Sequence, residues 1–192
     1  DSGLREALRQ EHFVLHYQPI VDIRDGRLLA AEALIRWHHP KKGVLYPGAF
    51  IDIAEQSGMI NAIGSWVLEA ACRQLNIWQH HNADLSMHVN VSARQFFSGN
   101  LYEQVWQLLT RYRLKPKTLI LEITETELMG DIRHATLLCQ ELAELGVGLA
   151  IALMQGLNLI HPPAGANPLL VLMTGQTWPF LWQTVLPGAL LL

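Results

Sequence analysis

Two charged side chains, Glu32 and Arg36, are set into an otherwise apolar run at Leu28–Trp37. In an extended strand alternate residues share a face, so Glu32, Leu34 and Arg36 point the same way. Burying a lone charge is costly, so charged groups in such a strand are paired, hydrated or bound to an ion. The pattern is therefore compatible with a strand-end salt bridge and with a site for an ionic ligand.

Two later strand-like segments carry further oxygen donors, Asn90 and Glu122. If successive parallel strands end at one edge, these groups meet Glu32 there. Carboxylate and amide oxygens suit Mg²⁺ or Mn²⁺ better than zinc. Such an ion clamps a phosphodiester and turns bound water into hydroxide, and the fork of Arg36 matches phosphate oxygens. Each residue alone also has a structural explanation: Asn90 could form a hydrogen bond at a strand end, and Glu122 could form a structural ion pair.

Apolar strand-like runs and amphipathic helical segments alternate over residues 1–151 and must position these groups. Strands are predicted at residues 13–21, 28–37, 86–92, 118–124 and 147–153. Helices are predicted at residues 4–11, 47–58, 61–79, 100–113 and 131–146. Asn100 and Glu103 are expected to form a capping box, while Asp131 and Gly146 are expected to bound the last helix. The Asp25-Gly26 turn predicts that the first two strands are antiparallel neighbours, and the later alternation is typical of a mostly parallel sheet or barrel.

The composition fits one domain of 192 residues with half of its residues apolar. A net charge of −3 provides no basic surface for a nucleic-acid polymer, although a small nucleotide remains compatible. Cys72 and Cys139 lack metal-type spacing and are predicted to be buried free thiols. His38 and His39 are predicted to lie in a solvated loop at residues 38–43, not in a zinc site.

Five sequence blocks occur in one order along the chain. They are Gln18-Pro19-Ile20-Val21, Glu32-Ala33-Leu34-Ile35-Arg36-Trp37, Ile53-Ala54-Glu55, Val89-Asn90-Val91-Ser92 and Leu121-Glu122-Ile123-Thr124-Glu125. Over about residues 4–151 the chain resembles the EAL domain, the cyclic-di-GMP phosphodiesterase domain of bacterial signalling. The combination of blocks is far more specific than the Glu-Ala-Leu tripeptide alone.

The resemblance implies an α/β fold, a modified TIM-like (β/α) barrel with its first strand antiparallel. It implies hydrolysis of cyclic-di-GMP to linear pGpG with Mg²⁺ or Mn²⁺ held by Glu32, Asn90 and Glu122. Cyclic-di-GMP would be held by Gln18, Leu34, Arg36 and Pro47. The catalytic and supporting carboxylates would be Glu32, Glu55 and Glu125. The family also implies the bacterial cytoplasm or the cytoplasmic face of the inner membrane, in a longer protein with sensory or cyclase domains.

The resemblance ends after Ile151. Where the family has Asp-Asp-Phe-Gly, which supplies one ligand to each of two metals, this chain has Ala152-Leu153-Met154-Gln155. The family's later catalytic lysine has no counterpart, because no lysine follows Lys117. About five of eight barrel strands are recognisable, so the expectation is an incomplete barrel, inactive in hydrolysis and prone to self-association.

Residues 152–192 form an uncharged, apolar tail, and no Asp, Glu, Lys or Arg follows Glu144. Three origins are compatible with it: a reading-frame change near codon 152 that truncates the domain, a membrane-seeking stretch at Pro168–Leu192, and a divergent natural ending. Two alternatives to an enzyme therefore stay open. The chain could be a degenerate module that binds cyclic-di-GMP or a protein partner without hydrolysis, or a truncated product without function.

Overall fold

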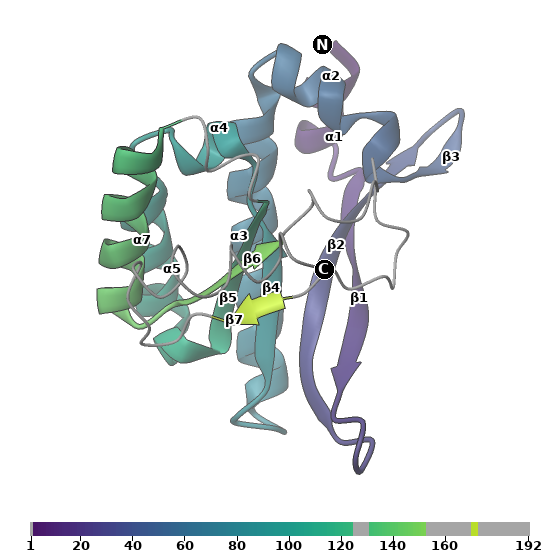
Figure 1. The fold of residues 1–192 in the computed structure, drawn as a ribbon. Helices are drawn as coiled ribbons and strands as arrows, with labels where there is room; N and C mark the ends of the chain where they lie inside the picture. The colour runs from purple at the N-terminus through teal and green to yellow at the C-terminus, as the bar shows by residue number, and fades with distance from the viewer. Residues whose placement is uncertain (1, 125–130, 153–169, 173–192) are drawn as a thin grey trace, which may run out of the picture.

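The fold is known from a computed structural model, which describes residues 2–124, 131–152 and 170–172 (Figure 1). Its strands are β1 (Phe13–Val21), β2 (Leu28–His39), β3 (Gly43–Leu45), β4 (Ser86–Asn90), β5 (Leu119–Thr124), β6 (Gly148–Ala152) and β7 (Leu170–Leu172). Its α-helices are α1 (Ser2–Arg9), α2 (Ile51–Gln56), α3 (Met59–Gln79), α4 (Ala93–Phe96), α5 (Leu101–Tyr112) and α7 (Ile132–Leu145). Two short 3₁₀ helices are η1 (Pro47–Ala49) and η2 (Pro116–Thr118).

One sheet joins all the described strands, in the order β1-β2-β4-β5-β6-β7, with β3 paired to β2. The β1–β2 pair is antiparallel, whereas the pairs β2–β4, β4–β5 and β5–β6 are parallel. The predicted antiparallel first pair and the parallel succession after it are confirmed. Over the described residues the sheet stays open, with β1 at one end and β7 at the other.

The second strand is longer than predicted, and the predicted loop at residues 38–43 is wrong. β2 continues through His38 and His39, which pair with Val44 and Gly43 of β3. Gly43 has a φ of 72°, a left-handed conformation that suits glycine at this tight turn. The His39 ring lies 4.9 Å from the Trp37 ring, an aromatic contact between two residues of β2 itself. In the tail, β7 is a strand that the sequence pattern does not predict.

The helix ends test the predicted caps individually. The Asp131 side chain accepts a hydrogen bond from the His134 backbone N–H, and Gly146 ends α7 with a φ of 91°, as predicted. The capping box at Asn100 is wrong, because its side chain caps no helix N–H. Its Oδ1 instead accepts a hydrogen bond of 2.5 Å from the Ser98 hydroxyl, a local alternative to the cap.

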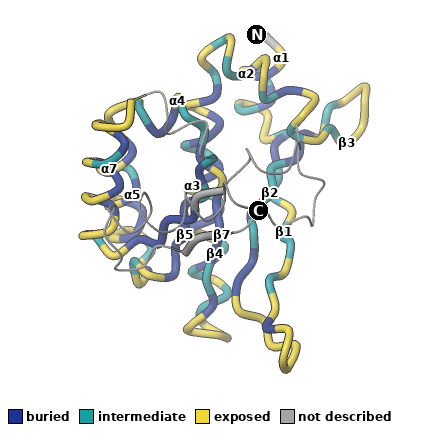
Figure 2. The backbone as a smooth tube through the Cα atoms, viewed as in Figure 1, coloured by how far each residue is buried: buried dark blue, intermediate teal, exposed yellow. Residues whose placement is uncertain are grey.

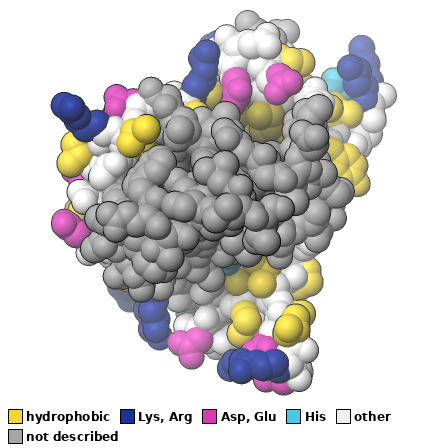
Figure 3. Space-filling model, in the orientation of Figure 1, with side chains coloured by type: hydrophobic (Ala, Val, Ile, Leu, Met, Phe, Trp, Pro, Cys, Tyr) yellow, Lys and Arg dark blue, Asp and Glu magenta, His cyan; other side chains and the backbone are white. Residues whose placement is uncertain are grey.

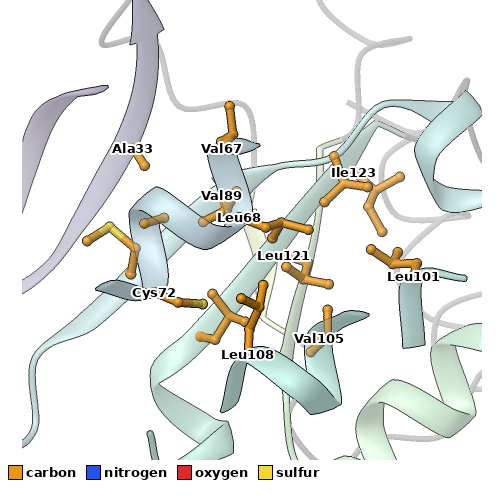
Figure 4. Packing of buried hydrophobic residues seen from close by; sticks show 14 of the residues in the cluster. Ala33, Val67, Leu68, Cys72, Val89, Leu101, Val105, Leu108, Leu121 and Ile123 are labelled. Carbon is orange, nitrogen blue, oxygen red and sulfur yellow. The ribbon is translucent and has the colours of Figure 1, made fainter. Parts of the chain in front are cut away.

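The hydrophobic core lies between the sheet and the helices α3, α5 and α7, of which α5 contacts both of the others. Leu68 and Cys72 of α3, Leu108 of α5 and Leu121 of β5 converge there (Figure 4). Buried residues follow the strands and the sheet-facing sides of these helices (Figure 2). Cys72 and Cys139 are free and buried as predicted, and burial raises the pKa of each thiol to about 12.

Hydrophobic side chains also reach the surface beside the tip of the β1–β2 hairpin, next to the charged residues of the tip itself (Figure 3). The exposed ones are Val21, Ile23, Leu28 and Leu29. Exposed apolar groups of this kind favour association, but self-association of the chain stays a prediction.

Candidate functional site

Three neighbouring strands bring the predicted oxygen donors to one face of the sheet. In the register of β2 and β4, Glu32 lies opposite His88, and in the register of β4 and β5, Asn90 lies opposite Glu122. Register partners share a face, as do residues two apart on one strand. All four side chains therefore project from the same side of the sheet.

The hydrogen bonds between these side chains run diagonally to the register. The Asn90 Nδ2 donates to Glu32 Oε1 at 2.9 Å, and the His88 Nδ1 lies 2.6 Å from Glu122 Oε1. Glu32, whose register partner is His88, is thus bonded to Asn90. Glu122, whose register partner is Asn90, is bonded to His88. The structure brings Glu32, Asn90 and Glu122 together, while their role as metal ligands stays a prediction.

The electrostatics of this cluster disfavour two free carboxylates. Burial raises the pKa of Glu32 above its ordinary value, and the nearby Glu122 carboxylate raises it further. The hydrogen bond from Asn90 and the charges of His88 and Arg36 act in the opposite direction, but the balance is a raised pKa. Uptake of a proton or a cation would relieve the repulsion between the two carboxylates and stabilise the site.

The donor set fits one hard divalent ion. Over the described residues no group of three or more His, Cys, Asp or Glu side chains could hold a metal. Glu32 and Glu122 are nonetheless two carboxylates, and the amide of Asn90 gives its NH₂ to Glu32 and keeps its oxygen for a ligand. Mg²⁺ commonly takes only one or two carboxylates and completes its shell with water and substrate phosphate.

Arg36 lies further along β2 and is held by contacts of its own. Only 8% of its surface is exposed, its Nη1 donates to the Ile35 carbonyl at 2.8 Å, and its guanidinium lies 4.6 Å from the Tyr46 ring centre. Its Nε is buried and without a hydrogen-bond partner among the described residues. No ion pair joins Arg36 to Glu32 within the same residues, and the salt-bridge alternative for this strand stays a prediction. A role of the guanidinium in anion binding stays a prediction.

Two further predicted ligand-binding residues share the face of Glu32. Gln18 of β1 lies opposite Glu32, and Leu34 follows Glu32 by two residues on β2. Pro47 begins η1 directly after Tyr46, the residue under the Arg36 guanidinium. Gln18 and Leu34 therefore share the face of the carboxylate cluster, Pro47 lies next to the residue that contacts Arg36, and the role of all three stays a prediction.

The predicted supporting carboxylates are Glu55 and Glu125. Glu55 lies on α2, and over the described residues no hydrogen bond or ion pair joins it to Glu32 or Glu122. Glu125 lies outside the described residues. The catalytic role of both stays a prediction.

Sequence reasoning missed two members of the site, His88 and Tyr46. His88 shares a face with Asn90 through the alternation of β4, and that alternation was the signal that could have found it. Tyr46 precedes Pro47 in a short connection between β3 and η1, where no periodicity marks a side chain. Its contact with Arg36 depends on the β2–β3 hairpin, which the sequence pattern does not predict.

The raised pKa of Glu32 predicts a pH-dependent effect of Glu32→Gln. Because folding raises the pKa of Glu32, this group supports stability below its unfolded pKa and loses that contribution as the pH rises through the folded value. Glu32→Gln keeps an acceptor for Asn90 and removes the buried charge. We expect a higher melting temperature than wild type at pH 7.5 without metal, and a gain that shrinks as the pH falls towards ~4.5. Thermal melts between pH 4 and 8 measure this, and a gain that grows on acidification would contradict it.

The comparisons with known proteins agree with this geometry. The family model described as the EAL domain matches residues 1–155, and a second one, described as the HPP transmembrane region, matches residues 123–192. The bifunctional diguanylate cyclase/cyclic di-GMP phosphodiesterase MucR of Pseudomonas aeruginosa is 43% identical over 149 residues, which are 77% of this chain and 22% of MucR. The cyclic di-GMP phosphodiesterase NbdA of the same species is 41% identical over 152 residues, 79% of this chain and 19% of NbdA.

A solved structure described as the PaMucR phosphodiesterase in complex with c-di-GMP matches the fold with a TM-score of 0.76 at 42% identity. The match covers 79% of this chain and 62% of that one. The predicted fold class is thereby confirmed as a TIM-like α/β barrel that is incomplete over the described residues.

The chain spans about a fifth of the length of the two curated relatives. Among the helices that the structure describes, none combines the length and the apolar character needed to cross a bilayer. From the family match over residues 1–155, the sequence blocks and the shared fold, we conclude that this chain belongs to the EAL domain family.

Proposed function

We propose that the chain is an EAL-family cyclic-di-GMP phosphodiesterase domain that, as a 192-residue chain, binds its ligand weakly and does not hydrolyse it. The observation that carries the proposal is the shared face of Glu32, Gln18, Leu34 and Arg36, next to the strands that hold Asn90 and Glu122. MucR and NbdA, which carry phosphodiesterase names, support cyclic-di-GMP as the ligand.

Each residue has a part that follows from its chemistry. Glu32, Asn90 and Glu122 would hold Mg²⁺ or Mn²⁺, which when bound neutralises phosphate charge and lowers the pKa of a bound water. Arg36 would donate N–H groups to phosphate oxygens, and the Tyr46 ring packs against its guanidinium at 4.6 Å. Gln18, Leu34 and Pro47 would border the rest of the ligand.

The proposed loss of hydrolysis depends on the end of β6. Ala152 and Leu153 stand where the family has two metal-binding aspartates, and neither a methyl group nor an isobutyl group can ligate a metal. One ion could still bind at Glu32 and Glu122. A second ion, and with it the clamp on both sides of the phosphodiester, has no ligands in this segment.

Several wider properties stay proposals. These are the division into an EAL part at residues 1–151 and a tail at residues 152–192, the origin of the tail, further sensory or cyclase domains in a longer protein, and a bacterial cytoplasmic location. The match to the HPP transmembrane region at residues 123–192 supports the membrane-seeking alternative for the tail. Apart from β6 and β7, this tail lies outside the described residues. A module that binds a protein partner, or a truncated product without function, remains the alternative to a ligand-binding domain.

Isothermal titration calorimetry with cyclic-di-GMP tests the proposed function. We expect a dissociation constant of roughly 100 μM or weaker, since without metal the phosphates meet Glu32 and Glu122 as like charges. Arg36→Ala should weaken binding about tenfold or more, because charge-assisted hydrogen bonds are lost. Arg133→Ala, which removes an exposed guanidinium from α7, should leave binding unchanged. No binding at millimolar ligand would overturn the proposal, and low-micromolar binding lost in Arg36→Ala would favour a dedicated sensor.

A further inference from the structure

The central strand of the site, β4, carries one hydrogen-bond donor for each carboxylate of the flanking strands. Asn90 serves Glu32 of β2, and His88 serves Glu122 of β5. We propose that His88 is a positioning residue that turns the Glu122 carboxylate toward Glu32, so that one divalent ion can contact both. This inference rests on the metal site of the proposed function and assigns a role to a residue outside the predicted ligand set.

The geometry of the contact defines which atom acts. The His88 Nδ1 lies 2.6 Å from Glu122 Oε1, with 7% of the His88 side chain and 17% of the Glu122 side chain exposed. A carboxylate only accepts hydrogen bonds, so Nδ1 carries the proton and donates it. Because Nδ1 is engaged by Glu122, His88 acts on a metal through that carboxylate.

The diagonal pairing gives this donor a specific task. Glu32 and Glu122 repel one another, and the charge of Glu122 contributes to the raised pKa of Glu32. Without hydrogen bonds from β4, this repulsion would turn the two carboxylates away from one another, each over its own strand. The donors of β4 draw both toward the middle strand, with Asn90 holding one and His88 holding the other.

The imidazole is held firmly enough to do this. His88 lies between Met87 and Val89, which are both fully buried on the opposite face of β4, and its own residue is 5% exposed. A ring in such a setting has little freedom to follow a moving carboxylate. Removing a hydrogen bond from a fixed donor to a metal-binding group typically weakens metal binding by about 10- to 100-fold.

Two substitutions separate the donor from the bulk of the ring. His88→Asn keeps an N–H donor near the position of Nδ1, whereas His88→Leu keeps an apolar volume and removes the donor. His81→Leu, at an exposed turn after α3, is the matched control. The probe is Mn²⁺ alone, with free Mn²⁺ measured by electron paramagnetic resonance on the full 192-residue chain, after circular dichroism has shown that each variant is folded.

We expect Mn²⁺ binding about tenfold or more weaker in His88→Leu, near wild type in His88→Asn, and unchanged in His81→Leu. Equal or tighter binding in His88→Leu would overturn the proposal, as would a wild-type chain that binds no Mn²⁺. The ¹⁵N resonances of the imidazole provide a second measurement that does not depend on metal or on folding of a variant. A protonated Nδ1 is expected, and an unprotonated Nδ1 would contradict the donor role.

The outcome is separable from that of the proposed function. If cyclic-di-GMP fails to bind while the Mn²⁺ series behaves as expected, the proposed function is overturned and the role of His88 stands for the metal site alone. If cyclic-di-GMP binds but His88→Leu leaves Mn²⁺ affinity unchanged, the proposed function stands and the role of His88 is overturned.

Discussion

The purified 192-residue chain is expected to release no measurable pGpG from cyclic-di-GMP in the presence of Mg²⁺ or Mn²⁺. Ala152 and Leu153 stand where the family has the aspartates that bind its two metals, and the loss of groups that act as a unit removes orders of magnitude of rate. Liquid chromatography of timed reactions resolves the linear product from the cyclic substrate.

Two controls make a negative result informative. The EAL domain of MucR, which carries a phosphodiesterase name, serves as the positive control for substrate and metal. Glu32→Gln in this chain gives the background from contaminating hydrolases. Product formation at about 1 per second or faster, abolished in Glu32→Gln, would show that the present residues suffice for hydrolysis.

The second large effect is expected from Leu121→Ala in the centre of the sheet. Leu121 of β5 is fully buried, and it converges with Leu68 of α3 and Leu108 of α5 (Figure 4). Removing three carbons leaves a cavity that its neighbours fill only in part, at a loss of about 2–5 kcal/mol in the free energy of unfolding. That is a large share of the ~5–15 kcal/mol that stabilises a typical domain.

Urea denaturation followed by circular dichroism measures this loss. Leu137→Ala makes the same chemical change on the outer face of α7, where 56% of the residue is exposed, and should alter stability by less than ~0.5 kcal/mol. Equal effects of the two substitutions would mean that the core described here is not the one that unfolds. The neighbouring Glu122 is expected to lose its position together with the core, so Mn²⁺ binding should weaken in Leu121→Ala as well.

Sequence patterns predict those features of this fold that depend on neighbours along the chain. The Asp25-Gly26 turn predicts the antiparallel β1–β2 pair, and the caps of α7 follow from Asp131 and Gly146. The shared face of Glu32, Leu34 and Arg36 follows from strand alternation once the strand is recognised.

Features that depend on contacts across the fold are beyond these patterns. The extension of β2 into the hairpin with β3 depends on the pairing of His38 with Val44 and of His39 with Gly43. The His88–Glu122 bond joins residues on two strands and requires their register, which side-chain periodicity does not specify. The capping box at Asn100 fails because Ser98 offers a competing hydrogen bond.

The short strand β7 has a consequence for assembling this domain from two chains. It runs antiparallel along β6, with Ala150, Ile151 and Ala152 as its partners. In a longer β/α succession, the next parallel strand would pair with this same edge of β6. One strand edge can accept only one ladder of hydrogen bonds, so β7 and such a strand exclude one another. A separately expressed polypeptide carrying further strands could therefore complement this chain only by strand exchange, in which it displaces β7 from β6.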